Sequence, residues 1–275
     1  MSEGTLDLTF RRDARGRTVL QGRRQRFPLR MTVPIHIDPA VPEMPFVYVQ
    51  NPTGGVFEGD RLSLSVRAAE GARAHVTSQS ATKLYRMVDG EALQHLRFAL
   101  MPGAYVEHVP EPLIPQRGAR YRQRTTVELE GDAVLVTAES VSPGRRAHGE
   151  RFAFDLLELR TSASHDGREL CTETLLFEPA RAGPARPGVL SDGDYLVTML
   201  AFAPARDTAH LASVVDRALM AAPGVLGAAG ELPNGAGVLA RVVADDAPAA
   251  QRGLRLAWAA ARRELIDAPL PPVRK

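Results

Sequence analysis

The sequence has one cysteine, Cys171, among 275 residues. A single thiol excludes an internal disulfide, a zinc ribbon and any Cys-x-x-Cys site. The longest mostly apolar run covers residues 195–203, far short of the roughly 20 residues that a membrane-spanning helix needs. The N-terminal residues lack the basic and apolar regions of a signal peptide, so we expect a cytoplasmic protein.

Lysine is also scarce, since Lys83 and Lys275 are the only two, and arginine carries nearly all the positive charge. Arginine favours planar partners such as carboxylates, which suits protein interfaces. The formal net charge is only +2. This balance excludes a dedicated, strongly basic nucleic-acid binder, although it is compatible with a local basic patch. Hydrophobic residues make up 44% and charged residues 24%, which is typical of a globular chain.

The first two-thirds of the chain predict short strands. Apolar and polar residues alternate in segments 6–10, 62–66, 96–100 and 152–156. A period of two is typical of strands with one buried and one exposed face. Glycine and proline interrupt these runs often, as turns between short strands require.

A loose internal repeat consists of an alternating run, a turn with glycine and a second run. Its copies begin at Leu62, Leu96 and Val127. Such units stack in a layered or β-helical, solenoid-like structure, but an antiparallel sandwich produces similar hairpins. His75 and His108 occupy corresponding places in two copies, so they either lie near each other or are ordinary strand residues.

The pattern changes after Pro204. Apolar residues at helical spacing predict one helix over 208–222 and a second over 248–266. The expected N-caps are Asp207 or Thr208 for the first helix and Asp245 or Asp246 for the second. Segment 224–237, rich in glycine and alanine, predicts a flexible connection. We therefore expect a mainly β chain with about two helices in the last quarter, organised as one domain over 1–275 with a β-rich body (1–204) and a helical part (205–275).

Two motifs resemble enzymatic ones, and each lacks a necessary part. Segment 54–61 has the spacing of a phosphate-binding loop, but Asp60 and Arg61 replace the required Lys and Ser/Thr. Ser80 and Lys83 fit the Ser-x-x-Lys of penicillin-binding hydrolases, but they follow a strand and the partner motifs are missing. No two histidines have metal-ligand spacing such as His-x-x-x-His. The sequence therefore predicts no catalytic residue and no tight metal site.

Segment 11–30 contains eight arginines and a single acid, Asp13. One interpretation is an electropositive docking surface for an acidic partner or a nucleic acid. The other is a solvated hairpin face in an arginine-rich protein. The sequence leaves both open.

Four segments carry a family resemblance. They are QNPTGGVFEGD (50–60), TSQSATKLYR (77–86), PEPLIPQRGARY (110–121) and SPGRRAHGERF (142–152). In this order they resemble the UreD family of urease accessory proteins, called UreH in some bacteria. The resemblance extends from about Thr5 to Trp258. Gln116 departs from the family pattern, in which an aromatic residue is usual there.

The resemblance implies a non-catalytic scaffold for urease maturation. Such proteins bind a helical partner, UreF, which recruits the GTPase UreG, and the assembly docks on apo-urease and supports nickel insertion. It also implies that GTP is used by the partner alone, that nickel is bound only transiently, and that a dimer forms only through the UreF-type partner. A β-rich protein-binding module of another assembly is the alternative function.

The resemblance further implies an internal polar channel for nickel. A conduit must attract a divalent ion and release it, so it needs few, weak, oxygen-rich ligands. The expected nickel-path residues are acids in or near the family-like segments, with Glu111 as a lesser candidate and with basic residues as charge partners: Asp60, Glu139 and Glu150, with Lys83 and Arg145. The other interpretation of each acid is a surface or structural ion pair.

Overall fold

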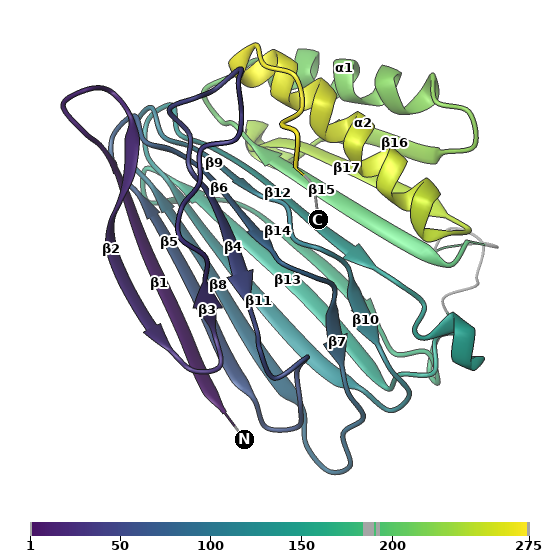
Figure 1. Cartoon of the computed structure of the whole chain (residues 1–275). Helices are drawn as coiled ribbons and strands as arrows, with labels where there is room; N and C mark the ends of the chain where they lie inside the picture. Colours follow the sequence, from purple (N-terminus) through teal and green to yellow (C-terminus); the bar gives the residue numbers. More distant parts are fainter. Residues whose placement is uncertain (1, 184–189, 191–192, 274–275) are drawn as a thin grey trace.

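The computed structural model describes residues 2–183, 190 and 193–273. Two β-sheets face each other, and the chain winds through them as a β-solenoid of about four turns, with two helices in the C-terminal part (Figure 1). This architecture confirms the predicted mainly β, solenoid-like fold with two C-terminal helices.

The seven-stranded sheet, called sheet A, contains in spatial order β14 (Arg168–Phe177), β13 (Leu156–His165), β11 (Arg120–Leu129), β8 (Ala92–Leu100), β5 (Arg61–Ala68), β1 (Glu3–Arg12) and β2 (Thr18–Arg26). The ten-stranded sheet, called sheet B, contains β16 (Leu226–Glu231), β17 (Gly237–Ala244), β15 (Tyr195–Phe202), β12 (Val134–Val141), β9 (Tyr105–His108), β6 (Arg73–Ser78), β4 (Phe46–Gln50) and β3 (Arg30–Met31), together with the short strands β10 (Leu113–Pro115) and β7 (Thr82–Leu84).

Parallel stacking forms the centre of both sheets. Strands β1, β5, β8, β11 and β13 run parallel in that order across sheet A. Strands β4, β6, β9 and β12 do the same across sheet B. Because neighbouring strands lie one turn apart in the chain, each turn of the solenoid covers the one before it.

The register of the stacked strands is offset from the starts of the sequence repeat. Leu64, two residues after the start of its copy, lies opposite Leu96, and Leu96 lies opposite Thr125, two residues before Val127. Since the turns between strands differ in length, similar runs in successive copies are not the residues that become neighbours.

The parallel stack ends in antiparallel strands. In sheet A, β2 pairs antiparallel with β1 at one edge, and β14 pairs antiparallel with β13 at the other. In sheet B, β15, β17 and β16 continue antiparallel from β12.

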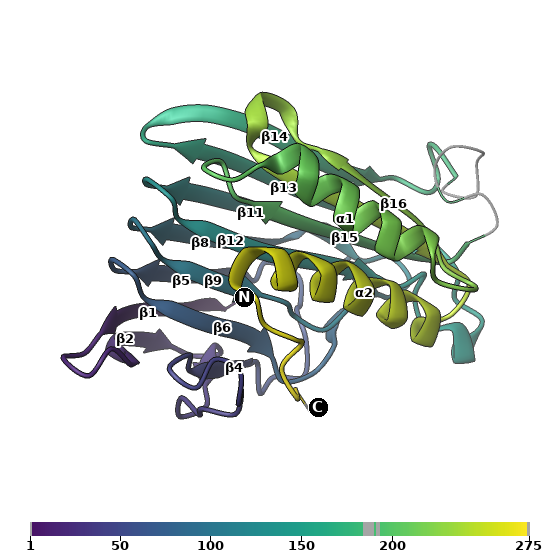
Figure 2. The same ribbon diagram turned by 90° about the horizontal axis from the view of Figure 1, so that it is seen from above.

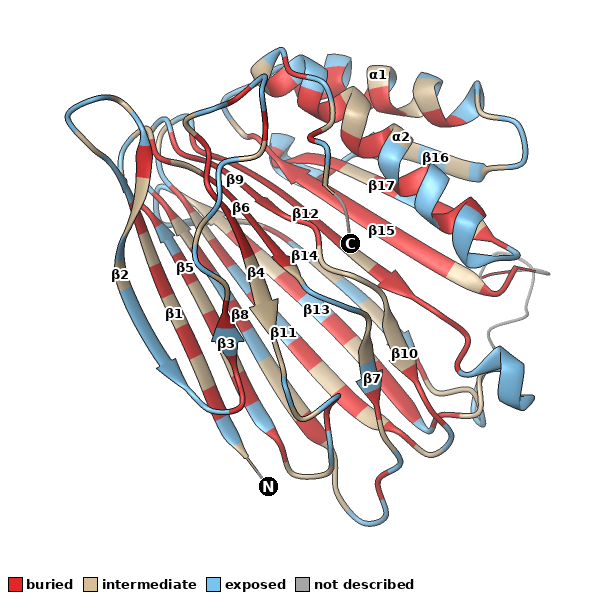
Figure 3. Cartoon of the chain, viewed as in Figure 1, coloured by how far each residue is buried: buried red, intermediate tan, exposed pale blue. Residues whose placement is uncertain are grey.

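Two hydrophobic cores lie on the two faces of sheet B. Between the sheets, residues such as Leu64 and Phe98 are buried. Between sheet B and the helices, Phe46, Val215 and Trp258 are buried. Exposure alternates along the strands of sheet A, whereas the middle strands of sheet B are buried on both faces (Figure 3). The middle strands of sheet B therefore lack the alternation that a half-buried strand imposes on a sequence.

Both helices lie against sheet B (Figure 2), at the predicted places: α1 (Thr208–Met220) and α2 (Ala247–Ile266). The Asp207 side chain accepts a hydrogen bond from the His210 N–H at 2.9 Å, and Asp246 accepts one from the Ala249 N–H at 2.7 Å. Both N-caps were within the predicted choices. No helix in the described part of the chain has the length and apolar character to cross a membrane.

The predicted flexible connection at 224–237 is wrong, because β16 lies within it. A Cβ on Gly227 would lie 3.0 Å from the Arg241 carbonyl oxygen and 3.4 Å from Leu219 of α1. The small residues therefore allow this edge strand to pack closely under α1. From composition alone, the same glycine and alanine residues predict a flexible segment. Two short 3-10 helices complete the chain, η1 (Arg146–His148) and η2 (Pro233–Gly235).

Candidate functional site

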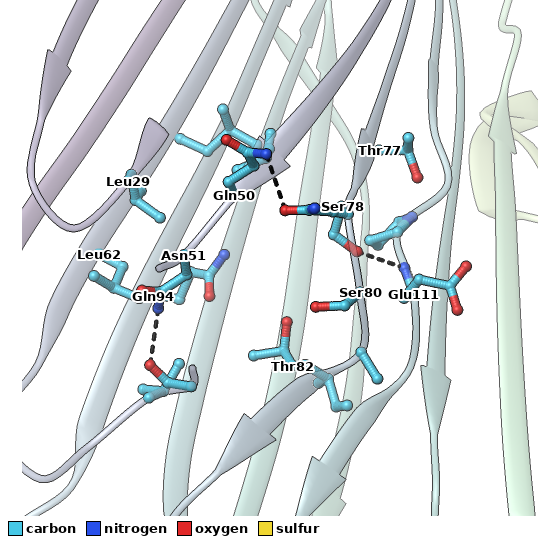
Figure 4. A pocket seen from close by; sticks show the side chains of 18 of the residues that line it. Leu29, Gln50, Asn51, Leu62, Thr77, Ser78, Ser80, Thr82, Gln94 and Glu111 are labelled. Carbon is cyan, nitrogen blue, oxygen red and sulfur yellow. Dashed lines mark hydrogen bonds between the residues drawn. The ribbon is translucent and has the colours of Figure 1, made fainter. Parts of the chain in front are cut away.

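A polar cavity of about 460 Å³ lies between the two sheets. Sheet A contributes Gln94 and Gln123 to its wall, and sheet B contributes His108 and Glu139. Figure 4 shows how Ser78, Ser80, Thr82 and other polar side chains gather around it. We call this space the inter-sheet cavity. It places amide, hydroxyl and carboxylate groups where a β-sandwich normally has apolar packing.

Glu139 is one of two acids, with Glu111, that line this cavity. Its side chain accepts a hydrogen bond from Gln123 Nε2, and the described residues contain no cation paired with it. Burial raises the pKa of Glu139 to about 7, the charge of Glu173 adds to this rise, and the Gln123 hydrogen bond opposes it. The carboxyl group therefore exchanges its proton near neutral pH.

Further polar side chains continue from Glu139 across the interior. Thr198 lies directly opposite Glu139 on β15, and Arg241 lies opposite Thr198 on β17. On sheet A, the neighbouring strands place Thr125, Thr161 and Glu173 in one row. We call this set the polar band: Gln123, Thr125, Thr161, Glu173, Glu139, Thr198 and Arg241.

The polar band runs from the inter-sheet cavity to the partly exposed Glu173–Arg241 ion pair. The hydroxyl groups of Thr125 and Thr198 are buried and have no hydrogen-bond partner among the described residues. A buried hydroxyl without a partner costs free energy unless water or an ion satisfies it. The polar band thus contains two buried hydroxyl groups that the described side chains leave unsatisfied.

Sheet B is interrupted beside this cavity. Strand β9 pairs with β12 only as far as Thr137, and β10 pairs with β12 only at Val141. The chain between them contains Pro110 and Pro112, which lack the N–H groups that a ladder needs. The interruption therefore leaves a gap in the backbone pairing of the sheet.

A second cavity, of about 890 Å³, lies on the other side of this gap under α2. We call it the helix-side cavity. Six residues border both cavities: Gln79, Ser80, Ala81, Pro110, Glu111 and Ser140. Glu111, the lesser candidate, thus lies at the junction between the two spaces.

Glu107 is a buried carboxylate of sheet B, and it faces the helices. Its carboxylate accepts hydrogen bonds from the Tyr105 hydroxyl at 2.7 Å and from Trp258 Nε1 at 3.2 Å, and it lies 2.8 Å from His75 Nδ1. The Arg262 guanidinium is 3.5 Å away, and it also pairs with the buried Asp38. Burial alone would raise the pKa of Glu107, but the hydrogen bond and charge of His75, followed by Arg262 and Tyr105, hold it below its ordinary value.

The two repeat histidines lie on opposite faces of sheet B. His75 is opposite Glu107 and stacks between Phe46 and Trp258 on the helix side. His108 is opposite Val76, lines the inter-sheet cavity and lies 3.2 Å from the Thr137 hydroxyl. His108 is one residue beyond Glu107, the residue opposite His75. Because adjacent positions of a strand point to opposite faces, the two histidine side chains lie on different sides of sheet B.

Comparison with known proteins identifies the family. The family model described as UreD urease accessory protein matches residues 2–275. The chain belongs to the UreD family of urease accessory proteins. It is 37% identical over 279 residues to the urease accessory protein UreD of Haloarcula marismortui, which covers 99% of this chain and 90% of that protein. It is 36% identical over 263 residues to UreD of Mycolicibacterium gilvum (96% and 95% covered) and 32% identical over 258 residues to UreD 2 of Brucella ovis (93% and 85% covered).

Three of the four UreD-like segments meet at the inter-sheet cavity. Its wall includes residues from 50–60, from 77–86 and from 110–121. These segments are separated in the chain and come together because successive solenoid turns stack. The residues that carry the UreD resemblance therefore surround the same space as Glu139.

The other two acids predicted for the nickel path, Asp60 and Glu150, lie outside the wall of this cavity. Asp60 is buried in a turn, where its carboxylate accepts bonds from the Ser2 N–H and hydroxyl, each at 2.9 Å, and from the Phe57 N–H at 3.0 Å. Glu150 forms an ion pair with Arg145 near η1. The Arg145 hydrogen bond holds the pKa of Glu150 below its ordinary value. Lys83 is exposed on the wall of the inter-sheet cavity. The structure therefore does not bring Asp60 and Glu150 to Glu139.

The sequence predictions missed most of the polar band. Gln123, Thr125 and Thr198 carry no motif, and their shared face becomes visible only with the strand register. Within the described ranges, no three His, Cys, Asp or Glu side chains are grouped so that they could hold a metal ion. A UreD-type conduit in this chain would therefore act through isolated oxygen ligands.

Proposed function

We propose that this protein is a non-catalytic urease maturation factor that binds UreF-type and UreG-type proteins and apo-urease. Its membership of a urease accessory family supports a role in maturation. In this proposal the partner GTPase uses GTP, and nickel is cargo that passes through the chain without a resident site. A dimer would form through the UreF-type partner.

The observation that carries the nickel-path proposal is Glu139 in the inter-sheet cavity. A partly buried carboxylate without a cationic partner is costly for the fold and attractive to a divalent ion. One carboxylate with amide and hydroxyl oxygens is a weak, hard ligand set, which suits transit better than storage. Because nickel would compete with a proton that Glu139 exchanges near pH 7, arrival of the ion would release that proton.

The openings of the path are part of the proposal. One opening is the gap in sheet B beside Glu111, which faces the helix-side cavity. The other is the end of the polar band at the Glu173–Arg241 pair. The roles predicted for Asp60, Glu150 and Lys83 stay predictions, and Asp60 is the one to test beside Glu139.

The test is co-expression of the tagged chain with the UreF-type, UreG-type and urease proteins of its own genome. The wild-type chain is expected to co-purify with both accessory proteins and to activate urease. Glu139→Leu should keep this co-purification while lowering the nickel content and activity of urease, because an apolar side chain removes the ligand and narrows the cavity. Glu139→Gln should give a smaller loss.

Glu128→Gln is the matched control, because it removes an exposed carboxylate on the outer face of sheet A. It should activate urease normally. Full nickel loading with Glu139→Leu would refute the role of Glu139, and a loss with Asp60→Asn alone would move the path toward Asp60. A wild-type chain that recovers neither accessory protein would favour the alternative, a binding module of another assembly.

A further inference from the structure

The outer face of sheet A is not covered by either helix, because α1 and α2 both pack on sheet B (Figures 1 and 2). Strand register places His95, Arg124 and Arg160 side by side on β8, β11 and β13. All three side chains are exposed on this outer face. With neighbouring strands about 5 Å apart, the three positions extend over roughly 10 Å. We call these three residues, one histidine and two arginines, the arginine row.

The arginine row differs from the other arginines around it. Arg97 pairs with Glu128 at 2.8 Å, and Arg122 pairs with both Glu91 and Glu158. Among the described residues, no ion pair includes Arg124 or Arg160, although these two lie directly opposite each other. Like charges directly opposite on a sheet destabilise it. Arg124 and Arg160 thus form an unfavourable like-charge pair, whereas the neighbouring Arg97 and Arg122 are neutralised by glutamates.

An exposed apolar side chain lies beside the row. Leu176 on β14 is 50% exposed and is opposite Glu158, so it is diagonal to Arg160 on the same face. The row's neighbours on this face also include four small, hydroxyl-bearing residues: Ser63, Thr126, Ser162 and Thr174. Arginines next to an apolar anchor on an otherwise flat surface are typical of a protein interface.

We propose that the arginine row and Leu176 form a docking surface for the acidic surface of a partner protein. The proposal rests on the proposed function, in which the partner is a component of the urease maturation assembly. Carboxylates of the partner would pair with Arg124 and Arg160, since guanidinium groups bind carboxylates in a planar, bidentate manner. A nucleic acid fits less well, because Glu128 and Glu158 on the same face would repel its phosphates and Leu176 would have no counterpart.

The test uses the full chain in complexes reconstituted with the UreF-type protein, the UreG-type protein and apo-urease. Arg124→Glu combined with Arg160→Glu should weaken binding of one of these components by about tenfold or more at low salt, with a smaller difference at high salt. Leu176→Ala should weaken binding of the same component without changing its salt dependence. Folding of each variant is checked by circular dichroism, and Arg124→Gln with Arg160→Gln replaces the double reversal if that variant does not fold.

Arg23→Glu combined with Arg24→Glu on the edge strand β2 is the matched control, since it changes the net charge equally at the far edge of the same sheet. Unchanged affinity in the Arg124/Arg160 variant, or an equal loss in the Arg23/Arg24 variant, would overturn the proposed location. A labelled DNA duplex that binds wild type and not the double variant, with protein assembly intact, would overturn the choice of partner. A wild-type chain that binds none of the three components would overturn both this inference and the proposed function.

Discussion

Two glutamates of sheet B, Glu107 buried and Glu139 partly buried, have opposite surroundings. Glu107 faces the helices and has Tyr105, Trp258, His75 and Arg262 around its carboxylate, and its pKa is lowered. Glu139 faces the inter-sheet cavity with one amide donor, and its pKa is raised to about 7. The paired carboxylate connects sheet B to Trp258 and Arg262 of α2, whereas no cation among the described residues pairs with Glu139.

The largest effect is expected on the helix side. Arg262→Met removes the cation between Asp38 and Glu107, both of which are buried. Leaving two buried carboxylates without their cation should lower the free energy of unfolding by about 3–5 kcal/mol. Urea unfolding followed by circular dichroism measures this change. A loss below about 1 kcal/mol would mean that the cluster contributes little to holding α2, and the contrast with Glu139 would fail.

The pH dependence of stability should differ in sign between the two glutamates. The folded pKa of Glu139, about 7, lies above its ordinary value of 4.5, so the unfolded chain releases this proton first as pH rises. Its contribution to stability therefore falls between about pH 4.5 and 7, by at most about 3 kcal/mol, and is level above that range. Glu107 has a lowered folded pKa, so its contribution is present above its ordinary value and is lost as pH falls.

Unfolding experiments on Glu139→Gln and Glu107→Gln across this pH range measure both contributions. Relative to wild type, Glu139→Gln should become more stable as pH rises to 7, whereas Glu107→Gln should become less stable as pH rises from the acid side. Glu128→Gln, on the exposed face, should follow wild type. Parallel curves for the Glu139 and Glu107 variants would contradict the assignment of opposite environments.

A smaller effect on stability is expected when the hydroxyl groups of two buried tyrosines, Tyr105 and Tyr121, are removed. The Tyr105 hydroxyl donates to the Glu107 carboxylate at 2.7 Å, and the Tyr121 hydroxyl lies 2.7 Å from the Gln94 side-chain oxygen beside the inter-sheet cavity. A hydrogen bond to a charged group contributes more than one between neutral groups. We expect a loss of about 1.5–3 kcal/mol for Tyr105→Phe and about 1 kcal/mol for Tyr121→Phe in thermal unfolding. Equal losses would show that the charge of Glu107 does not matter for stability.

The elements with local signals were predictable from sequence. Helical spacing and an aspartate before each helix located α1 and α2, and alternation located β1, β5 and β8. The strand predicted at 152–156 was wrong, because β13 begins only at Leu156. Glu139 was singled out because it follows the apolar run 134–136 of the sequence. Register was not predictable, since it depends on turn lengths that differ between solenoid turns. Glu107 was missed for a different reason. Strand β9 is buried on both faces, so its sequence does not alternate and gives no sign of which residue faces α2.

The reversal of strand direction at the ends of sheet A determines how many turns the protein can have. A parallel solenoid exposes at each end an edge that matches the next turn, so an open stack can add further copies and grow into a fibre. Here β14 and β2 turn back antiparallel, and Arg23, Arg24 and Arg26 lie along the β2 edge. The edge of β16 is also protected, because Asp216 of α1 accepts the Ala229 N–H at 2.9 Å. The edges of sheet A therefore do not present the parallel strand direction that a further turn of the solenoid would continue.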